Sequence, residues 1–269
     1  MFDTSVEILG ESSLVAILNK QAIGQMAETF SCLCEWSDGS TSTAYIKRFK
    51  KVDNLGILNE ITGYLIAKGC NLPVASRAGL VKSPPEIFND NSDDYLDWAF
   101  IVSEVSGTNP VTFFNVDMHK CKQLIDLVAS WDKVSHTIAF DDWVANQDRN
   151  LGNIIVKGKN EIFLIDHSNM PVSLNWQVKD LNPNVQTQNK LSDILWAFNT
   201  TPLPIRQKIC YEANQHSLIY NKVKDELNYW WSSLLDNDQL RLNALEKFIE
   251  QRANLGPSRI SSNLNMLAV

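Results

Sequence analysis

Two short apolar runs near the middle of the chain constrain its fold most strongly. Residues 153–156 read Asn-Ile-Ile-Val, residues 161–165 read Glu-Ile-Phe-Leu-Ile, and the Lys-Gly-Lys-Asn of 157–160 lies between them. A Gly- and Asn-containing turn between two apolar runs predicts a β-hairpin. The hairpin would place Asn153 beside Asp166, which directly follows the second run, because both lie at the same end of the paired strands.

Asp148 completes a pattern with these two residues. It lies five positions before Asn153, between a segment with helical spacing (Ile138, Phe140, Trp143, Val144) and the hairpin. Taken alone, Asp148 favours the simpler interpretation of a residue that caps a turn. Asp166 is different, because an unpaired charge directly after an apolar strand is costly. Together the three residues suit magnesium-dependent phosphoryl transfer: Asp148 orients and deprotonates an acceptor hydroxyl, while Asn153 and Asp166 hold Mg²⁺ against the phosphates of ATP.

The first 105 residues predict a β-rich unit with a single main helix. Apolar and polar residues alternate in several short runs, and Asp38-Gly39 is a strong hairpin signal. Helical spacing of Ile57, Ile61, Tyr64 and Leu65 predicts one helix, which Gly69, Asn71 and Pro73 would end. The strands are expected at 6–9, 14–18, 30–36, 43–49, 78–81 and 98–104, and the helix at 55–68.

Lys47 and Glu60 extend the predicted site into this unit. Lys47 lies near the end of a predicted strand and Glu60 in the following helix. In kinase-like sites a strand Lys holds the α- and β-phosphates and a helix Glu holds the Lys. Because Arg48 and Lys50 flank Lys47, a pair of plain surface charges is the alternative.

Two further parts of a nucleotide site are less distinct. Glu104 and Val105 come at the end of the last predicted strand, where backbone groups could meet the edge of an adenine. Neither G-x-G-x-x-G nor G-x-x-x-x-G-K-[ST] occurs. Two connections could cover the phosphates, residues 10–13 and residues 21–28. The second, which contains Gly24, is favoured.

The second half predicts a mainly helical unit. A linker at 106–110 precedes helices around 124–131 and 138–144, and a polar stretch at 167–190 has no clear period. Further helices are expected at 191–198, 204–216, 218–235 and 238–253. The expected class is therefore α+β, with an N-terminal lobe at 1–105, a helical lobe at 106–255 and a tail at 256–269.

Composition narrows the partners. The formal net charge is −7, with 24 Lys and Arg against 31 Asp and Glu, and an acidic chain repels nucleic-acid phosphates. There is no apolar run of the roughly 18 residues that a membrane span needs, and the first residues lack a secretory apolar core. A cytoplasmic protein is expected. The five cysteines are scattered, and Cys32 and Cys34 are interpreted as buried thiols rather than zinc ligands.

At Asp148-Arg149-Asn150-Leu151-Gly152-Asn153 and Leu164-Ile165-Asp166-His167 the chain resembles the HipA-like branch of the protein-kinase-like superfamily, and it is similar there to the catalytic loops of phosphatidylinositol kinases. Tyr45-Ile46-Lys47 and Asn59-Glu60-Ile61 also look like the HipA-like first lobe. The resemblance covers roughly residues 5–200. Two departures stand out: Asn150 occupies a position where His is frequent, and a clear phosphate-loop motif is missing.

The resemblance implies a two-lobed kinase fold that uses ATP and Mg²⁺, with Ser/Thr phosphorylation of a protein substrate as in the family's toxins. Some members phosphorylate themselves on the phosphate loop. By motif, Asp148 matches the base, Asn153 and Asp166 the metal ligands, and Lys47 the ATP lysine. Two alternatives remain open. One is a kinase with a small-molecule or lipid acceptor, and the other is a catalytically silent kinase-like protein that binds a partner, such as an antitoxin-like protein.

Overall fold

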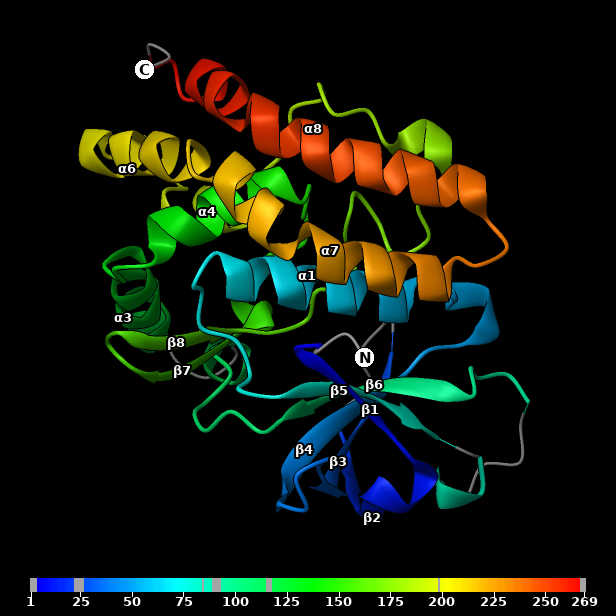
Figure 1. Cartoon of the computed structure of the whole chain (residues 1–269). Helices are drawn as coiled ribbons and strands as arrows, with labels where there is room; N and C mark the ends of the chain where they lie inside the picture. Colours follow the sequence, from blue (N-terminus) through cyan, green and yellow to red (C-terminus); the bar gives the residue numbers. More distant parts are fainter. Residues whose placement is uncertain are drawn as a thin grey trace.

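A six-stranded mixed sheet forms one side of the molecule and helices form the other (Figure 1). The structure is a computed structural model that describes residues 4–21, 27–83, 85–88, 93–114, 118–197 and 199–266. In spatial order the sheet reads β1, β5, β6, β4, β3, β2. β1 and β5 are parallel, and the other neighbours are antiparallel. The strands are β1 (Val6–Leu9), β2 (Leu14–Lys20), β3 (Glu28–Glu35), β4 (Thr41–Arg48), β5 (Ala78–Lys82) and β6 (Trp98–Ser103).

The helices follow the sheet in the chain, except for α1 (Gly56–Gly69), which lies between β4 and β5 in sequence. A separate hairpin of β7 (Ile154–Gly158) and β8 (Glu161–Leu164) lies beside α3 (Figure 1). The remaining helices are α2 (Val111–Phe114), α3 (Met118–Ala129), α4 (Val134–Trp143), α5 (Lys190–Leu195), α6 (Leu203–Ala213), α7 (His216–Leu234) and α8 (Gln239–Asn263). The predicted α+β class is confirmed. None of these described helices is long and apolar enough to cross a membrane.

Strand alternation gives β4 two different faces. Ala44 and Ile46 are buried in a small core on one face, together with Cys32 and Cys34 of β3. Lys47 therefore points to the opposite face, toward α1, with which it forms an ion pair. The apolar surroundings expected for Cys32 and Cys34 are confirmed.

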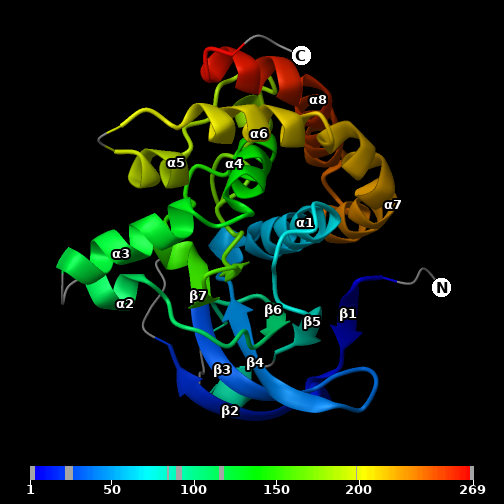
Figure 2. The ribbon, with the colours of Figure 1, turned by 90° about the vertical axis from the view of Figure 1, so that its left-hand side faces the viewer.

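Helix α1 is buried along most of its length, because the sheet packs on one side and α7 lies beside it on another (Figure 2). One hydrophobic core continues from the sheet through α1 to α4, α7 and α8. Trp231 of α7 also donates a hydrogen bond from Nε1 to Thr62 Oγ1 of α1, at 2.8 Å. Helix α1 thus packs against both the sheet and the helical part of the chain.

The connection at residues 10–13 is a short 3₁₀ turn that joins opposite edges of the sheet, since β1 pairs with β5 and β2 pairs with β3. Residues 21–28, by contrast, connect the antiparallel neighbours β2 and β3. Of this connection Gln21, Ala27 and Glu28 are described, and the next residue of β3, Thr29, is paired with Lys47. The turn at 10–13 adjoins Leu14, which is paired with Cys34 of β3, and Cys34 is paired with Ser42 of β4. Along β4, Ser42 is on the order of 17 Å from Lys47, at about 3.4 Å per residue.

The expected C-terminal tail is wrong for residues 256–263, which form the last turns of α8. Gly256 and Pro257 suggested a break, since Pro removes one helical hydrogen bond. Tertiary contacts outweigh that loss. Gly256 is buried in contact with α7, where an added Cβ would lie 3.4 Å from His216 Nδ1, and Arg259 Nε donates to Asp142 Oδ2 at 3.1 Å. Strand β6 also ends at Ser103, one residue earlier than expected.

Candidate active site

Lys47 joins residues from three distant parts of the chain. Its Nζ lies 2.5 Å from Glu60 Oε1 of α1 and 3.1 Å from Asp166 Oδ1, just after β8. The Lys47 and Glu60 side chains are 14% and 2% exposed, while that of Asp166 is 46% exposed. The fold therefore brings together three of the predicted residues, with the Asp166 carboxylate toward solvent.

The charges in this cluster support one another. Burial alone would lower the pKa of Lys47, but Asp166 and Glu60 outweigh burial and raise it. Burial would raise the pKa of Asp166, but Lys47 and a hydrogen bond from Ser168 hold it well below its usual range. Burial raises the pKa of Glu60, and Lys47 offsets part of that rise. Lys47 and Asp166 are accordingly a charged pair at neutral pH.

Helix α1 also fixes the segment that follows Asp166. Glu60 Oε2 accepts the backbone N–H of His167 at 3.1 Å. Its neighbour Asn59 donates to the carbonyls of Ser168 and Leu174 at 2.7 and 2.9 Å. Gly63 is required for this approach, because a Cβ there would lie 2.3 Å from His167 Cβ. Consecutive residues of one helix thus hold both the lysine and the backbone after the metal-binding candidate.

His167 is a structural imidazole in this arrangement. It is 4% exposed and packs edge-on against Phe140. Burial, with Arg149 and Lys47 nearby, lowers its pKa well below the usual value. A neutral ring behind Asp166 adds no positive charge to the cluster.

The side chain of Arg149 connects the Asp148 loop to the hairpin. It is completely buried and pairs with Asp141 of α4, with Nε 3.2 Å from Oδ1. Its Nη1 donates to the carbonyls of Ile165 and Asn153 at 2.8 and 3.2 Å. One carbonyl belongs to Asn153 itself and the other to the residue before Asp166. A single guanidinium therefore holds the backbone at both metal-ligand candidates.

Three asparagines hold the backbone of Asp148. Asn146 Oδ1 accepts its N–H at 3.0 Å, while Asn150 and Asn153 donate to its carbonyl at 2.9 and 3.1 Å. Asn150 Oδ1 also accepts Gly152 N–H at 2.7 Å and caps the 3₁₀ turn Leu151–Asn153. The residue that departs from the family pattern therefore contributes to the loop directly.

Asn153 and Asp166 lie at the same end of the hairpin, as predicted. Ile154 is paired with Leu164, and Ile165 N–H donates to the Asn153 carbonyl at 3.1 Å. Asn153 Nδ2 donates to the Asp148 carbonyl, and Asn153 Oδ1 makes no hydrogen bond among the described residues. Asp166 Oδ2 is likewise unpaired there. An amide oxygen and a carboxylate oxygen are a suitable donor set for Mg²⁺ that takes its other ligands from phosphates and water.

Asp166 adopts φ of 58°, a left-handed conformation that is uncommon for a residue with a side chain. Such conformations persist where surrounding contacts determine them, and they cluster at functional sites. Here the contacts are those of Arg149 on one side and of Glu60 on the other.

Asp148 itself is paired with a residue that sequence reasoning missed. Lys190 Nζ, at the start of α5, lies 2.9 Å from Asp148 Oδ1. The two side chains are 45% and 30% exposed, respectively. Lys190 is 42 residues away in the chain, and no local motif identifies it. Asn59 was missed for the same reason, whereas Arg149 lies inside the recognised motif.

Of the remaining residues predicted to contact a nucleotide, the structure describes Glu104 and Val105. Glu104 N–H donates to the Thr43 carbonyl at 3.0 Å, so it is not available to a ligand. The Glu104 carbonyl and the Val105 N–H make no backbone hydrogen bond among the described residues, and they offer one acceptor and one donor to an adenine edge. Gly24 lies outside the described residues.

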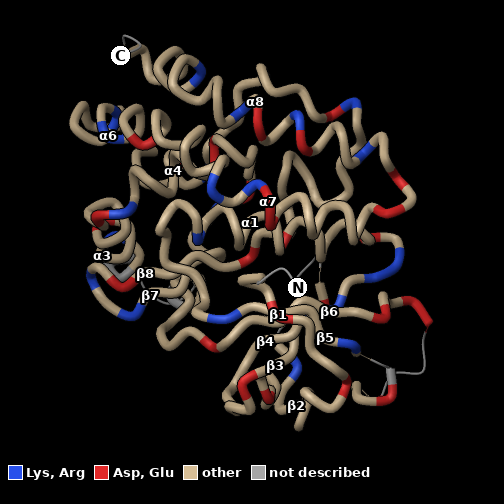
Figure 3. The backbone as a smooth tube through the Cα atoms, in the orientation of Figure 1, with Lys and Arg blue, Asp and Glu red and all other residues tan. Residues whose placement is uncertain are grey.

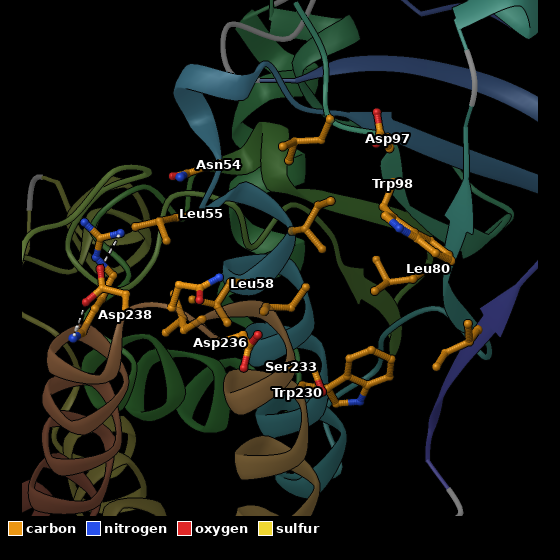
Figure 4. Close-up of a pocket in the computed structure, with 17 residues that line it drawn as sticks. Asn54, Leu55, Leu58, Leu80, Asp97, Trp98, Trp230, Ser233, Asp236 and Asp238 are labelled. Carbon is orange, nitrogen blue, oxygen red and sulfur yellow. Dashed lines mark hydrogen bonds and ion pairs between the residues drawn. The ribbon is translucent and has the colours of Figure 1, made fainter.

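A cavity lies elsewhere in the molecule. It has a volume of about 680 Å³ and lies between the start of α1, strands β5 and β6, and the α7–α8 turn (Figure 4). Leu55, Leu58, Leu80, Trp98 and Trp230 line it, and none of the predicted site residues does. Acidic residues mark the α7–α8 turn at its rim (Figure 3).

No group of three or more His, Cys, Asp or Glu side chains that could hold a metal ion occurs in the part of the chain that the structure describes. The magnesium candidate is the pair Asn153 and Asp166. Comparison with known proteins gave no match, either to a protein-family model or, at a significant level, to a curated protein.

Proposed function

We propose that this protein is an ATP- and Mg²⁺-dependent phosphotransferase with a two-lobed, protein-kinase-like architecture. The observation that supports it most is the Lys47 ammonium between Glu60 and Asp166, at 2.5 and 3.1 Å. A strand lysine, a helix glutamate and a carboxylate after a hairpin are the parts that hold ATP phosphates and Mg²⁺ in kinases.

Each residue would have a distinct role. Lys47 would bind the α- and β-phosphates, Glu60 would orient Lys47, and Asn153 and Asp166 would hold Mg²⁺, which neutralises charge on the transferred phosphoryl group. Asp148 would accept the proton of the acceptor hydroxyl as its oxygen attacks the γ-phosphorus and ADP leaves. Arg149 and the three asparagines around Asp148 hold the backbone that carries these groups in place.

A serine or threonine of a protein is the proposed acceptor, in line with the resemblance to HipA-like kinases. Incubation with γ-labelled ATP and Mg²⁺, with and without cell lysate, tests this by mass spectrometry of the labelled species. Labelled lysate protein supports the proposal. A labelled small molecule or lipid would support the alternative acceptors instead, and self-labelling alone would identify autophosphorylation.

A silent kinase-like binding protein is the second candidate. The observation that favours it is the cavity beside α1, whose apolar lining of Leu55, Leu58 and Trp230 could receive a protein partner. Thermal shift separates the two candidates, because ligand binding to the folded state raises the melting temperature. ATP with Mg²⁺ should raise it in a kinase and leave it unchanged in a silent protein.

A further inference from the structure

We propose that Lys190 is the positioning residue for Asp148 in the phosphotransfer reaction. This inference rests on the proposed function and adds a residue to its acceptor side. Lys190 Nζ is 2.9 Å from Asp148 Oδ1, although the two residues lie 42 positions apart.

The backbone around Lys190 is fixed, so its side chain extends from a defined point. Asn189 caps α5, its Oδ1 accepting Ser192 N–H at 2.9 Å. The Nδ2 of the same residue donates to the Ile138 carbonyl of α4 at 3.2 Å. Leu191 on the other side is completely buried. Helix α5 is thereby attached to α4, the helix that leads into the Asp148 loop.

Asp148 is held in a complementary way. Its backbone N–H and carbonyl are bound by Asn146, Asn150 and Asn153, which leaves the carboxylate free to turn about its side-chain bonds. Lys190 engages only Oδ1. Oδ2 makes no hydrogen bond within the described ranges and is therefore available to accept one from an acceptor hydroxyl. A cation at one oxygen thus selects the rotamer that presents the other.

The other cations of the site are committed elsewhere. Lys47 is bound to Glu60 and Asp166, and Arg149 to Asp141 and two carbonyls. Among the described residues, Lys190 is the cation that pairs with Asp148. Its pair is partly exposed, and exposed ion pairs contribute little to folding stability. Loss of Lys190 should therefore affect the orientation of the Asp148 carboxylate, and with it the reaction rate, more than the stability of the fold.

The test compares Lys190→Met and Lys190→Arg with a matched control, Lys157→Met. Lys157 forms a similarly exposed pair with Glu161 at 3.1 Å. This pair lies at the turn of the hairpin, whereas Asp148 is bonded to Asn153 at the opposite end. Lys190→Met should lower kcat about 10- to 100-fold, which is less than the roughly 10²- to 10⁴-fold expected when the proton-accepting group itself is lost. The KM for ATP and the melting temperature should stay unchanged, Lys190→Arg should recover most of kcat, and the control should match the wild type.

A double variant shows whether Lys190 acts through Asp148. If it does, Lys190→Met should have almost no further effect on the residual rate of Asp148→Asn. An equal loss in both backgrounds would overturn the positioning role, as would a Lys190→Met enzyme with wild-type or higher kcat. A wild-type protein that transfers no phosphate to any acceptor, including itself, would overturn the proposed function and this role with it.

Discussion

The two sides of the candidate site are built in contrasting ways. On the Lys47 side, the ion pair with Glu60 is almost fully buried and joins residues from β4, α1 and the end of β8. On the Asp148 side, the ion pair with Lys190 is partly exposed, and the loop is held mainly by neighbouring asparagines. The proposed nucleotide side therefore depends on the whole fold, whereas the proposed acceptor side depends on a local loop and one distant lysine.

This contrast predicts that changes on the two sides separate differently into activity and stability. Changes at the buried cluster should affect both, because removal of one partner leaves an uncompensated charge inside the protein. Changes at the exposed pair should affect activity alone.

Asp148→Ala should give the largest effect on rate. Removing the group that accepts the proton should lower phosphotransfer by about 10²- to 10⁴-fold, while the fold stays intact because the Asp148 side chain is 30% exposed. Initial rates with labelled ATP, together with circular dichroism, measure both quantities. Full ATP-dependent activity in this variant would exclude Asp148 as the base.

Lys47→Met should reduce both activity and stability. It leaves the Glu60 carboxylate, 2% exposed, without its cation, which should cost about 1–3 kcal/mol in the free energy of unfolding. Urea denaturation checks this value, and Lys51→Met, at an exposed pair with Asp93, is the matched control. Equal stability of the two variants would contradict the buried nature of the Lys47 pair.

Asn150→Ala should have a smaller effect. It removes the cap of the 3₁₀ turn and one hydrogen bond to the Asp148 carbonyl, and loss of such a cap costs about 1 kcal/mol. The variant should show a lower kcat with an unchanged KM for ATP. If kcat and stability both equal those of the wild type, Asn150 does not hold the loop.

The prediction with the smallest expected effect on activity concerns pH and lies outside the site. Burial lowers the pKa of His216 to about 3, and an unfolded histidine titrates near 6.5. The unfolded chain therefore binds the extra proton first, so stability is lost as pH falls from about 6.5 toward 3. His216→Phe can keep the stacking on Trp143. In this variant, the slope of the unfolding free energy against pH should correspond to about one proton fewer taken up on unfolding. An unchanged slope would show that His216 is already protonated when folded.

Local patterns were sufficient for the parts of the molecule that short-range chemistry determines. The hairpin, its turn and the proximity of Asn153 to Asp166 follow from two apolar runs around a Gly-containing turn. The same patterns predicted α1 to within one residue at each end. Each of these features depends on residues close together in sequence.

Long-range packing explains what the sequence did not reveal. Lys190 bonds to Asp148, and Asn59 bonds to Ser168, although the partners are far apart in sequence. The packing of α1 and α5 against the rest of the protein brings these residues together. The error at 256–263 has the same origin, since Gly256 and Pro257 suggest a break when read locally and yet are held in α8 by α6, α7 and Asp142.

The most direct test of the central claim is calorimetric titration of ATP with and without Mg²⁺ into the wild type, Lys47→Met, Asp166→Asn and Asp148→Asn. One joint nucleotide and metal site predicts Mg²⁺-enhanced binding to the wild type and to Asp148→Asn. It also predicts loss of binding in Lys47→Met and loss of the Mg²⁺ enhancement in Asp166→Asn. Absence of ATP binding to the wild type, or equal Mg²⁺-enhanced binding to all four proteins, would contradict the account.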